Sequence, residues 1–135
     1  MFGKKKQPPI RSLIAQCSQI DGNIRFSEGL RVDGTLVGTI SARSEQASIL
    51  VISETATVTG EIHADHIIIN GAVNGPVYAH VLLELQPKAR IYGDVHYRAL
   101  EMHQGAMVTG QLRPASELED KPTLKLATNS KQINS

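Results

Sequence analysis

A five-residue unit of the form apolar-any-Gly-any-apolar recurs six times along this 135-residue chain. The first residues of successive units are 16, 22, 15, 18 and 17 positions apart. The units are IDGNI (20–24), LVGTI (36–40), VTGEI (58–62), VNGPV (73–77), IYGDV (91–95) and VTGQL (108–112). A period close to 18 residues, kept over five intervals, predicts a chain that winds through similar turns.

A second apolar pair at alternate positions precedes most of these units. The pairs are Leu30/Val32, Leu50/Ile52, Ile67/Ile69, Leu83/Leu85 and Leu100/Met102. Apolar residues two apart lie on the same side of a strand, whereas the spacings of three and four that indicate a helix are absent. Val, Ile and Thr, which favour strands, dominate these segments. An ordinary antiparallel sandwich is the alternative, but it has no reason to keep two apolar positions in phase through every repeat.

We therefore predict an all-β fold, a single-domain parallel β-solenoid of about six turns. With turns about 4.8 Å apart, the rod is roughly 29 Å long. Equivalent residues are expected to form two inward ladders, Ile20-Leu36-Val58-Val73-Ile91-Val108 and Ile24-Ile40-Ile62-Val77-Val95-Leu112. The recurring glycine is expected where the backbone needs a positive φ or where neighbouring backbones approach closely. The longest interval contains ARSEQAS (42–48), which we assign to a loop at one corner.

Composition limits the other possibilities. Trp is absent and Phe occurs only twice, so the core must be aliphatic. A net charge of +1 gives no basic field for nucleic acid. One cysteine, no long apolar run and no secretory signal favour a cytoplasmic protein. We expect a disordered tail over residues 1–10, the solenoid domain over 11–113 and a second disordered tail over 114–135.

Three segments carry a family resemblance: LRVDGTLVGTI (30–40), LELQPKARIYGDVHY (83–97) and LEMHQGAMVTGQL (100–112). They closely resemble the bactofilins, the polymer-forming cytoskeletal proteins of bacteria. The resemblance implies a right-handed parallel β-helix of roughly triangular section. It also implies non-polar filaments that form without nucleotide, lie on the inner face of the cell membrane and localise cell-wall or morphogenesis proteins, such as peptidoglycan-remodelling enzymes.

The two ends of the solenoid are the candidate self-assembly sites. An uncapped solenoid exposes strand edges and a section of aliphatic core, and neither tail resembles a cap. The candidate residues are Leu13, Ile14, Ile20 and Ile24 in the first turn, and Leu100, Met102, Val108 and Leu112 in the last. The residues alone leave head-to-tail growth open. No GxxxxGK[ST] or GxGxxG motif is present, so we expect no nucleotide or other cofactor.

The N-terminus is a candidate membrane-binding segment. Met1 and Phe2 are followed by Lys4, Lys5 and Lys6, a combination that matches the apolar-basic start common in bactofilins. Each lysine near an anionic surface contributes about 1 kcal/mol, so one copy is a weak anchor and a filament of many copies a stronger one. A solvated basic tail without a partner is the alternative.

An enzyme is the competing class of function, either a carbonic anhydrase-like β-helix protein or an acyltransferase. His63, His80 and His96 are about one turn apart, as zinc ligands on adjacent turns would be. The register argues against zinc, because Tyr78 occupies the place between His63 and His96. Cys17 is interpreted as a small packing residue, and Glu61 and Asp94 as solvated outward side chains. A third possibility is a binding module that stays monomeric.

Overall fold

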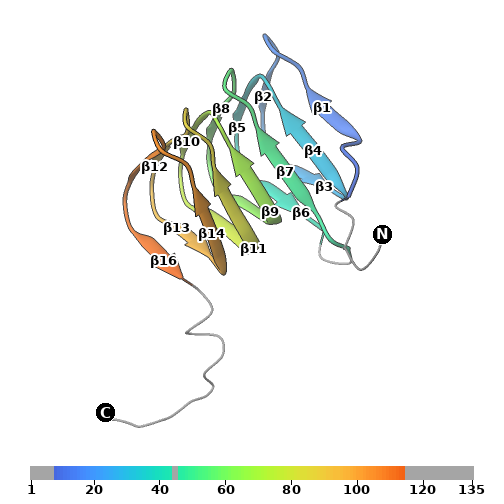
Figure 1. The fold of residues 1–135 in the computed structure, drawn as a ribbon. Coiled ribbons are helices and arrows are strands. Elements are labelled where there is room, and N and C mark those ends of the chain that lie inside the picture. Colours follow the sequence, from blue (N-terminus) through green and yellow to red (C-terminus); the bar gives the residue numbers. More distant parts are fainter. Residues whose placement is uncertain (1–7, 44–45, 115–135) are drawn as a thin grey trace, which may run out of the picture.

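A computed structural model describes residues 8–43 and 46–114, which contain sixteen strands and no helix. The chain winds through successive three-sided turns, so that the turns stack along one axis (Figure 1). Every strand pair is parallel, as expected when each turn pairs with the equivalent segment of the next. The described part contains no helix that could cross a membrane. The predicted all-β solenoid of about six turns is confirmed.

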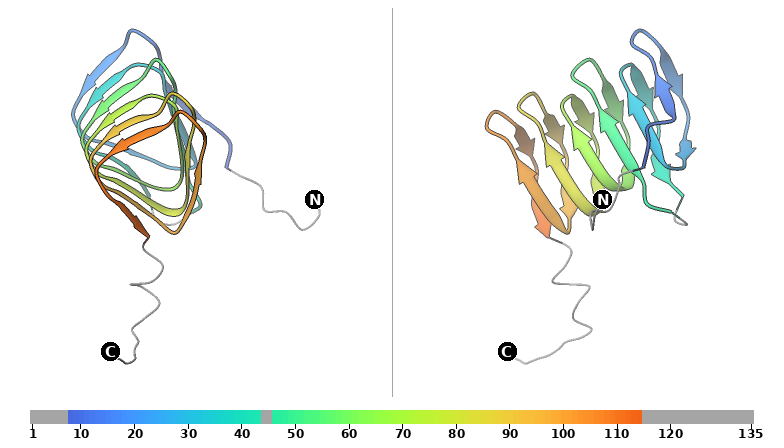
Figure 2. Two further views of the ribbon diagram at one scale, coloured as in Figure 1. Left: turned by 60° about the vertical axis from the view of Figure 1, so that its left-hand side comes forward. Right: turned by 45° about the vertical axis from the view of Figure 1, so that its right-hand side comes forward.

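The stacked turns form three faces, which are visible along the axis in Figure 2. The first face consists of β1 (Ser12–Ile14), β4 (Gly29–Val32), β7 (Ile49–Ile52), the second part of β9 (Ile62–Ile69), the second part of β11 (Val77–Leu85) and β14 (Ala99–Met102). The second face consists of β2 (Gln19–Asp21), β5 (Thr35–Val37), β8 (Thr57–Thr59), β10 (Ala72–Asn74), β12 (Arg90–Tyr92) and β15 (Met107–Thr109). The third face consists of β3 (Ile24–Phe26), β6 (Ile40–Ala42), the first parts of β9 and β11, β13 (Val95–Tyr97) and β16 (Leu112–Pro114).

Both predicted ladders occur in the predicted register. On the second face the strand pairing aligns Ile20 with Leu36 and continues without a shift to Val108. On the third face it aligns Ile24 with Ile40 and continues to Leu112. The side chains of the inner turns in these ladders are buried in one aliphatic core. The core is thus a set of stacked rungs, as an aromatic-poor sequence requires.

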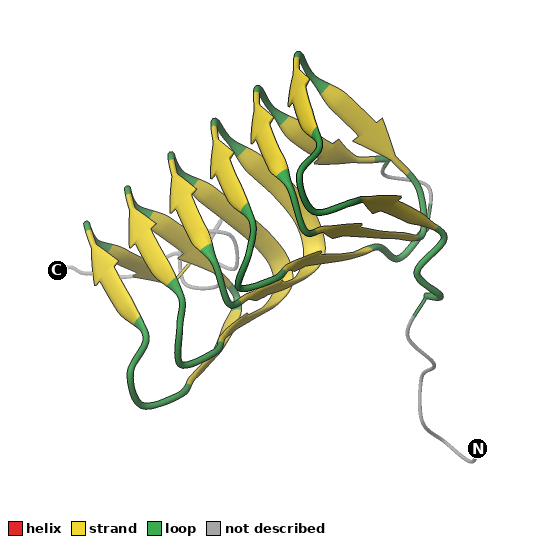
Figure 3. Cartoon of the chain, turned by 90° about the horizontal axis from the view of Figure 1, so that it is seen from above, coloured by secondary structure: helices red, strands yellow, loops and turns green. Residues whose placement is uncertain are grey.

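Equivalent strands and loops of successive turns lie one above another along the stack (Figure 3). The recurring glycines form a column at the corner between the second and third faces. Gly22, Gly38, Gly60, Gly75, Gly93 and Gly110 all have φ between 138° and 153°. A Cβ on Gly60 would lie 2.0 Å from the carbonyl oxygen of Gly38 in the turn before it. Both reasons predicted for glycine therefore apply at once: a positive φ and a close backbone approach.

The described residues between β6 and β7 form no strand, which agrees with the loop expected within residues 42–48. Its middle, residues 44–45, lies outside the described part. Two later turns have no such loop, because β9 and β11 each run from the third face directly onto the first. The corner between the first and second faces also varies, with two residues between β4 and β5 but four between β7 and β8. Turns of different lengths therefore keep one register by varying these two corners, while the glycine corner keeps a constant length.

Candidate self-assembly ends

Each end of the solenoid is a rung of strands paired on one side only. In the described part of the chain, β1, β2 and β3 pair with β4, β5 and β6 alone, and β14, β15 and β16 pair with β11, β12 and β13 alone. Unpaired edges of this kind are templates for adding further strands. Both ends therefore offer backbone groups to a partner.

The last turn leaves core-type side chains uncovered. Met102 is 45% exposed, although Leu85, its neighbour in the same ladder, is fully buried. Leu112 is also 45% exposed, above the fully buried Val95. Val108 and Leu100 are only partly buried. All four predicted residues of this end therefore lie together on the terminal rung.

The first turn is covered unevenly. Ile20 and Ile24 are partly buried, whereas Ile14 is 7% exposed. Leu13 does not face the core: it is aligned with Arg31 on the outer surface and is 58% exposed. The inward positions of β1 belong to Ser12 and Ile14, so Leu13 lies on the terminal turn but outside its core section, and its role in self-assembly stays a prediction. Two adjacent apolar residues in a three-residue strand leave the direction of each side chain undetermined in the sequence.

The two ends differ in which residues carry the unpaired backbone groups. Ile24 donates its N–H to the carbonyl oxygen of Thr39 in the next turn, and Ile14 accepts the N–H of Asp33. The backbone groups of core-facing residues thus form hydrogen bonds with the following turn. In a parallel sheet the outward-facing residues between them form hydrogen bonds with the preceding turn. The free groups of the first turn therefore belong to outward-facing residues such as Leu13 and Arg25. Those of the last turn belong to core-facing residues, among which Pro114 has no N–H to donate.

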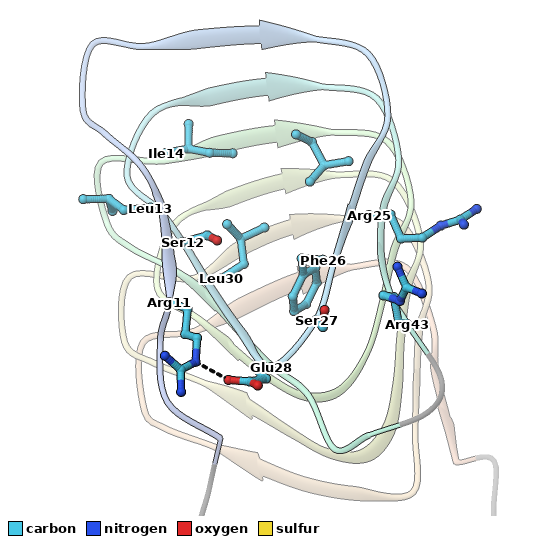
Figure 4. Close-up of a pocket in the computed structure, with 11 residues that line it drawn as sticks. Arg11, Ser12, Leu13, Ile14, Arg25, Phe26, Ser27, Glu28, Leu30 and Arg43 are labelled. Carbon is cyan, nitrogen blue, oxygen red and sulfur yellow. Dashed lines mark hydrogen bonds and ion pairs between the residues drawn. The ribbon is translucent and has the colours of Figure 1, made fainter.

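The N-terminal end is hollow (Figure 4). A cavity of about 520 Å³ opens there, with Ile24, Phe26 and Leu30 among its lining residues. Arg11 forms an ion pair with Glu28 at one side of the opening. The chain before β1 continues beside β4, because the Arg11 N–H donates to the Gly29 carbonyl oxygen at 3.0 Å. These described residues extend the first turn and do not cross its end.

Asp94 links the fifth and sixth turns, which corrects its interpretation as a merely solvated side chain. The Gln111 N–H donates to one carboxylate oxygen at 2.9 Å, and Arg113 Nε donates to the other at 3.1 Å. These two contacts hold the pKa of Asp94 below its ordinary value of 3.8, the hydrogen bond from Gln111 contributing most. Asn23 links two turns in the same way at the equivalent corner of the first turn, because its Oδ1 accepts the Thr39 N–H of the second turn at 2.9 Å.

The aromatic rings of the third face form a stack. The His63 and Tyr78 ring centroids are 4.5 Å apart with nearly parallel planes, and those of Tyr78 and His96 are 4.4 Å apart. The register predicted from the sequence is therefore right, because Tyr78 lies between the two histidines. In this arrangement His63 and His96 cannot share one ion. The stack itself was missed, although three ring-bearing residues at equivalent repeat positions were visible.

Two further residues were missed or misjudged. Phe26 is 6% exposed and fills part of the first turn; its position two residues after Ile24 was the signal for it. Cys17 is exposed, with a φ of 73° in a turn, so it is not the packing residue that was expected. The predicted membrane-binding residues Met1, Phe2, Lys4, Lys5 and Lys6 lie outside the described residues, as do residues 115–135.

The fold and its two ends define a class of protein, the parallel β-solenoids whose described terminal rungs are paired on one side only. The family model for bactofilins, described as polymer-forming cytoskeletal, matches residues 12–113. The chain thus belongs to the bactofilin family. It is similar to Bactofilin BacO of Myxococcus xanthus (strain DK1622), with 28% identity over 111 residues that cover 82% of this chain and 85% of the relative. No solved structure matches the chain significantly.

Proposed function

We propose that this bactofilin is a cytoskeletal scaffold whose subunits join end to end into filaments without nucleotide. The observation that carries this proposal is the exposure of Met102 and Leu112 above ladder neighbours that are fully buried. If an end contact buries about 500 Å² of apolar surface, burial contributes about 12 kcal/mol. Association costs about 4–15 kcal/mol, so backbone pairing between the edge strands must add to burial. Assembly should consequently depend on protein concentration.

The test compares core-facing and outward-facing residues of the last turn. Val108→Glu and Leu112→Glu place a carboxylate on the terminal rung and should abolish filaments in negative-stain images. Thr109→Glu, on the outward side of the same strand as Val108, is the matched control and should leave the filaments intact. Circular dichroism must show that all three variants remain folded. Filaments from folded Val108→Glu and Leu112→Glu proteins would overturn end-to-end assembly.

We further propose that the filaments have no polarity, with like ends joined. The bactofilin resemblance supports this arrangement, in which the axial repeat is two subunits, roughly 58 Å. Head-to-tail growth gives a repeat of one subunit, roughly 29 Å, since six turns stack about 4.8 Å apart. Power spectra of filament images separate the two cases. A repeat of one subunit would contradict the non-polar arrangement.

The N-terminal segment is proposed to hold the filaments on the inner face of the cell membrane, where they position cell-wall enzymes. Support comes from the Met1–Phe2 pair followed by three lysines, and from the multiplication of a weak anchor along a polymer. Phe2→Arg should release the tagged protein into the cytosol while purified filaments remain intact. Unchanged membrane localisation would exclude this role. Co-sedimentation of candidate wall enzymes with filaments, and not with Leu112→Glu protein, tests the scaffold role.

A further inference from the structure

The outer surface of the first face carries an ordered series of side chains, one from each turn. From the first turn to the last, the series is Leu13, Arg31, Val51, Ile68, Glu84 and Glu101. The two middle positions are apolar, the second is basic and the last two are acidic. Charge and apolar surface are therefore distributed along the axis of this face.

The other two faces lack this pattern. The equivalent series on the second face is Asp21, Val37, Thr59, Asn74, Tyr92 and Thr109. On the third face it is Arg25, Ser41, His63, Tyr78, His96 and Arg113. Only the first face, which is turned toward the viewer in Figure 1, has an aliphatic centre in its middle turns, where Leu82 adds to Val51 and Ile68.

The side chains of this series are available at its charged positions. The Arg31 side chain is 51% exposed and pairs with Asp33 through one nitrogen, which leaves other guanidinium donors for a partner. The Glu101 and Glu84 side chains are 54% and 21% exposed. Both lie near His103, whose Nε2 is 2.9 Å from Glu101 Oε2 and 3.7 Å from Glu84 Oε2. The acidic end of the face thus keeps exposed carboxylate.

We propose that the first face binds the first face of a second copy, with the two solenoid axes antiparallel. The two-fold axis of this pair lies between the two faces, perpendicular to the solenoid axes, at the level midway between turns three and four. It places turn three of one copy opposite turn four of the other, and turn two opposite turn five. Val51 then meets Ile68 at the centre, and Arg31 meets Glu84 on either side. One patch is complementary to itself only in this orientation, since parallel axes would place Arg31 against Arg31 and Glu84 against Glu84.

A second copy fits the face better than a membrane does. An anionic lipid surface would attract Arg31 but repel Glu84 and Glu101, so the charges of the face would oppose one another there. The face measures roughly 29 Å by 13 Å, or about 370 Å² per copy, because six strands lie side by side and all but the three-residue β1 contribute four residues. Stable pairs commonly bury about 800 Å² per partner. A single pair is therefore weak, and the contact becomes effective when it repeats along a filament; to that extent it rests on the proposed function.

Cross-linking tests the orientation directly. Facing sheets pack about 10 Å apart, too far for a disulfide, so a short bis-maleimide is the appropriate reagent. In a Cys17→Ser background, Arg31→Cys and Glu84→Cys proteins are mixed unpolymerised, allowed to assemble together and then cross-linked. In the mixed pair the two cysteines lie opposite one another and one Arg31–Glu84 contact remains, whereas in a pair of identical variants the cysteines are three turns apart along the axis, about 14 Å. We expect a cross-linked dimer from the mixture, at least fivefold more than from either protein alone. Val37→Cys mixed with Tyr92→Cys, at the same turns of the second face, is the matched control and should give none.

Charge exchange tests the pairing of Arg31 with Glu84. Arg31→Glu should leave end-to-end filaments intact but reduce paired filaments in negative-stain images by at least tenfold. Arg31→Glu combined with Glu84→Arg should restore them. Equal cross-linking of Arg31→Cys with itself and with Glu84→Cys, or no rescue by the double exchange, would overturn the proposal.

A membrane is the competing occupant and has its own readout. Flotation of Phe2→Arg protein with anionic vesicles that is lost on Ile68→Asp would assign this face to lipid and overturn the pairing of copies. The outcomes also separate the two proposals. Single filaments without pairing contradict only the lateral contact. Cross-linked pairs without filaments, seen at high protein concentration, support the lateral contact and contradict end-to-end assembly.

Discussion

The inner turns and the end turns of the solenoid are made of the same residue types but are covered differently. Val58 and Val73, in the third and fourth turns, are fully buried because a rung lies on each side of them. Val108 occupies the same ladder position in the sixth turn and is only partly buried. Burial in this fold therefore comes from stacking and not from the composition of a turn. A terminal turn therefore cannot bury its core-facing side chains within one molecule. In the proposed assembly, the terminal turn of a second molecule covers them.

The largest difference between inner and end turns is expected in the glycine column. Gly60→Ala would place a Cβ 2.0 Å from a carbonyl oxygen and should lower the free energy of unfolding by at least about 3 kcal/mol. At Gly22 in the first turn, no atom lies within 4 Å of an added Cβ. Gly22→Ala should therefore cost only the strain of its positive φ, about 1–2 kcal/mol. Urea denaturation of both variants measures this, and equal losses would show that the close approach does not matter.

In the ladder of the third face, the loss of stability should differ less between an inner and a terminal residue than it does for the two glycines. Ile62→Ala removes a fully buried side chain and should lower the free energy of unfolding by about 2–5 kcal/mol. Leu112→Ala removes a side chain that is 45% exposed, so the loss should be below about 1 kcal/mol. The same truncation should raise the protein concentration needed for filaments, because it removes apolar surface from the end. Sedimentation measures that concentration; an unchanged value would remove Leu112 from the end contact.

The smallest effect concerns the corner carboxylates and depends on pH. Hydrogen bonds from Ser53 and Arg31 lower the pKa of Asp33, and contacts from Gln111 and Arg113 lower that of Asp94. A lowered pKa in the folded protein stabilises it above pH 3.8, and this contribution disappears as the pH falls below 3.8 through the lowered value. Asp94→Asn should therefore reduce the dependence of the melting temperature on pH in this acidic range.

Hydrogen exchange locates this loss. Between pH 5 and pH 3, amides of the last turn should lose protection in the wild type, after correction for the intrinsic exchange rate. Asp33→Asn is the interior comparison, and its effect should be confined to the second and third turns. A pH dependence that both variants leave unchanged would mean that neither corner contributes.

The ladder register was predictable from the sequence because two patterns agree: the repeat of about 18 residues and the apolar residues at alternate positions within each strand. Each of the six units shows its inward residues on either side of a glycine, so an error in one turn would disturb the spacing of the next. The direction of Leu13 was not accessible, because Leu13 and Ile14 are adjacent and no glycine unit precedes them. The solenoid was therefore predictable where repeats constrain one another and least predictable in its first turn.

The positions of the candidate assembly residues at the two ends were predictable from the sequence, but the surroundings of their side chains were predictable only in part. That Val108 and Leu112 lie at an end follows from counting turns. The cavity lined by Phe26 depends on how one large ring packs in the first turn, which no other turn covers on its outer side. The positions of apolar residues in the sequence do not determine this packing. The corner contacts of Asp94 were missed for a related reason, since a side chain that links two turns looks in the sequence like any exposed carboxylate.

Pro114 has a mechanical consequence. Because its backbone nitrogen carries no hydrogen, the terminal rung of the third face has one N–H donor fewer for a partner strand. The terminal strands of the other two faces contain no proline. A joint made at this end would consequently be stiffer along two sides of the triangle than along the third. Such a joint flexes most easily in one direction, and a rod with a preferred plane of bending can follow a curved surface without breaking its stiffer sides.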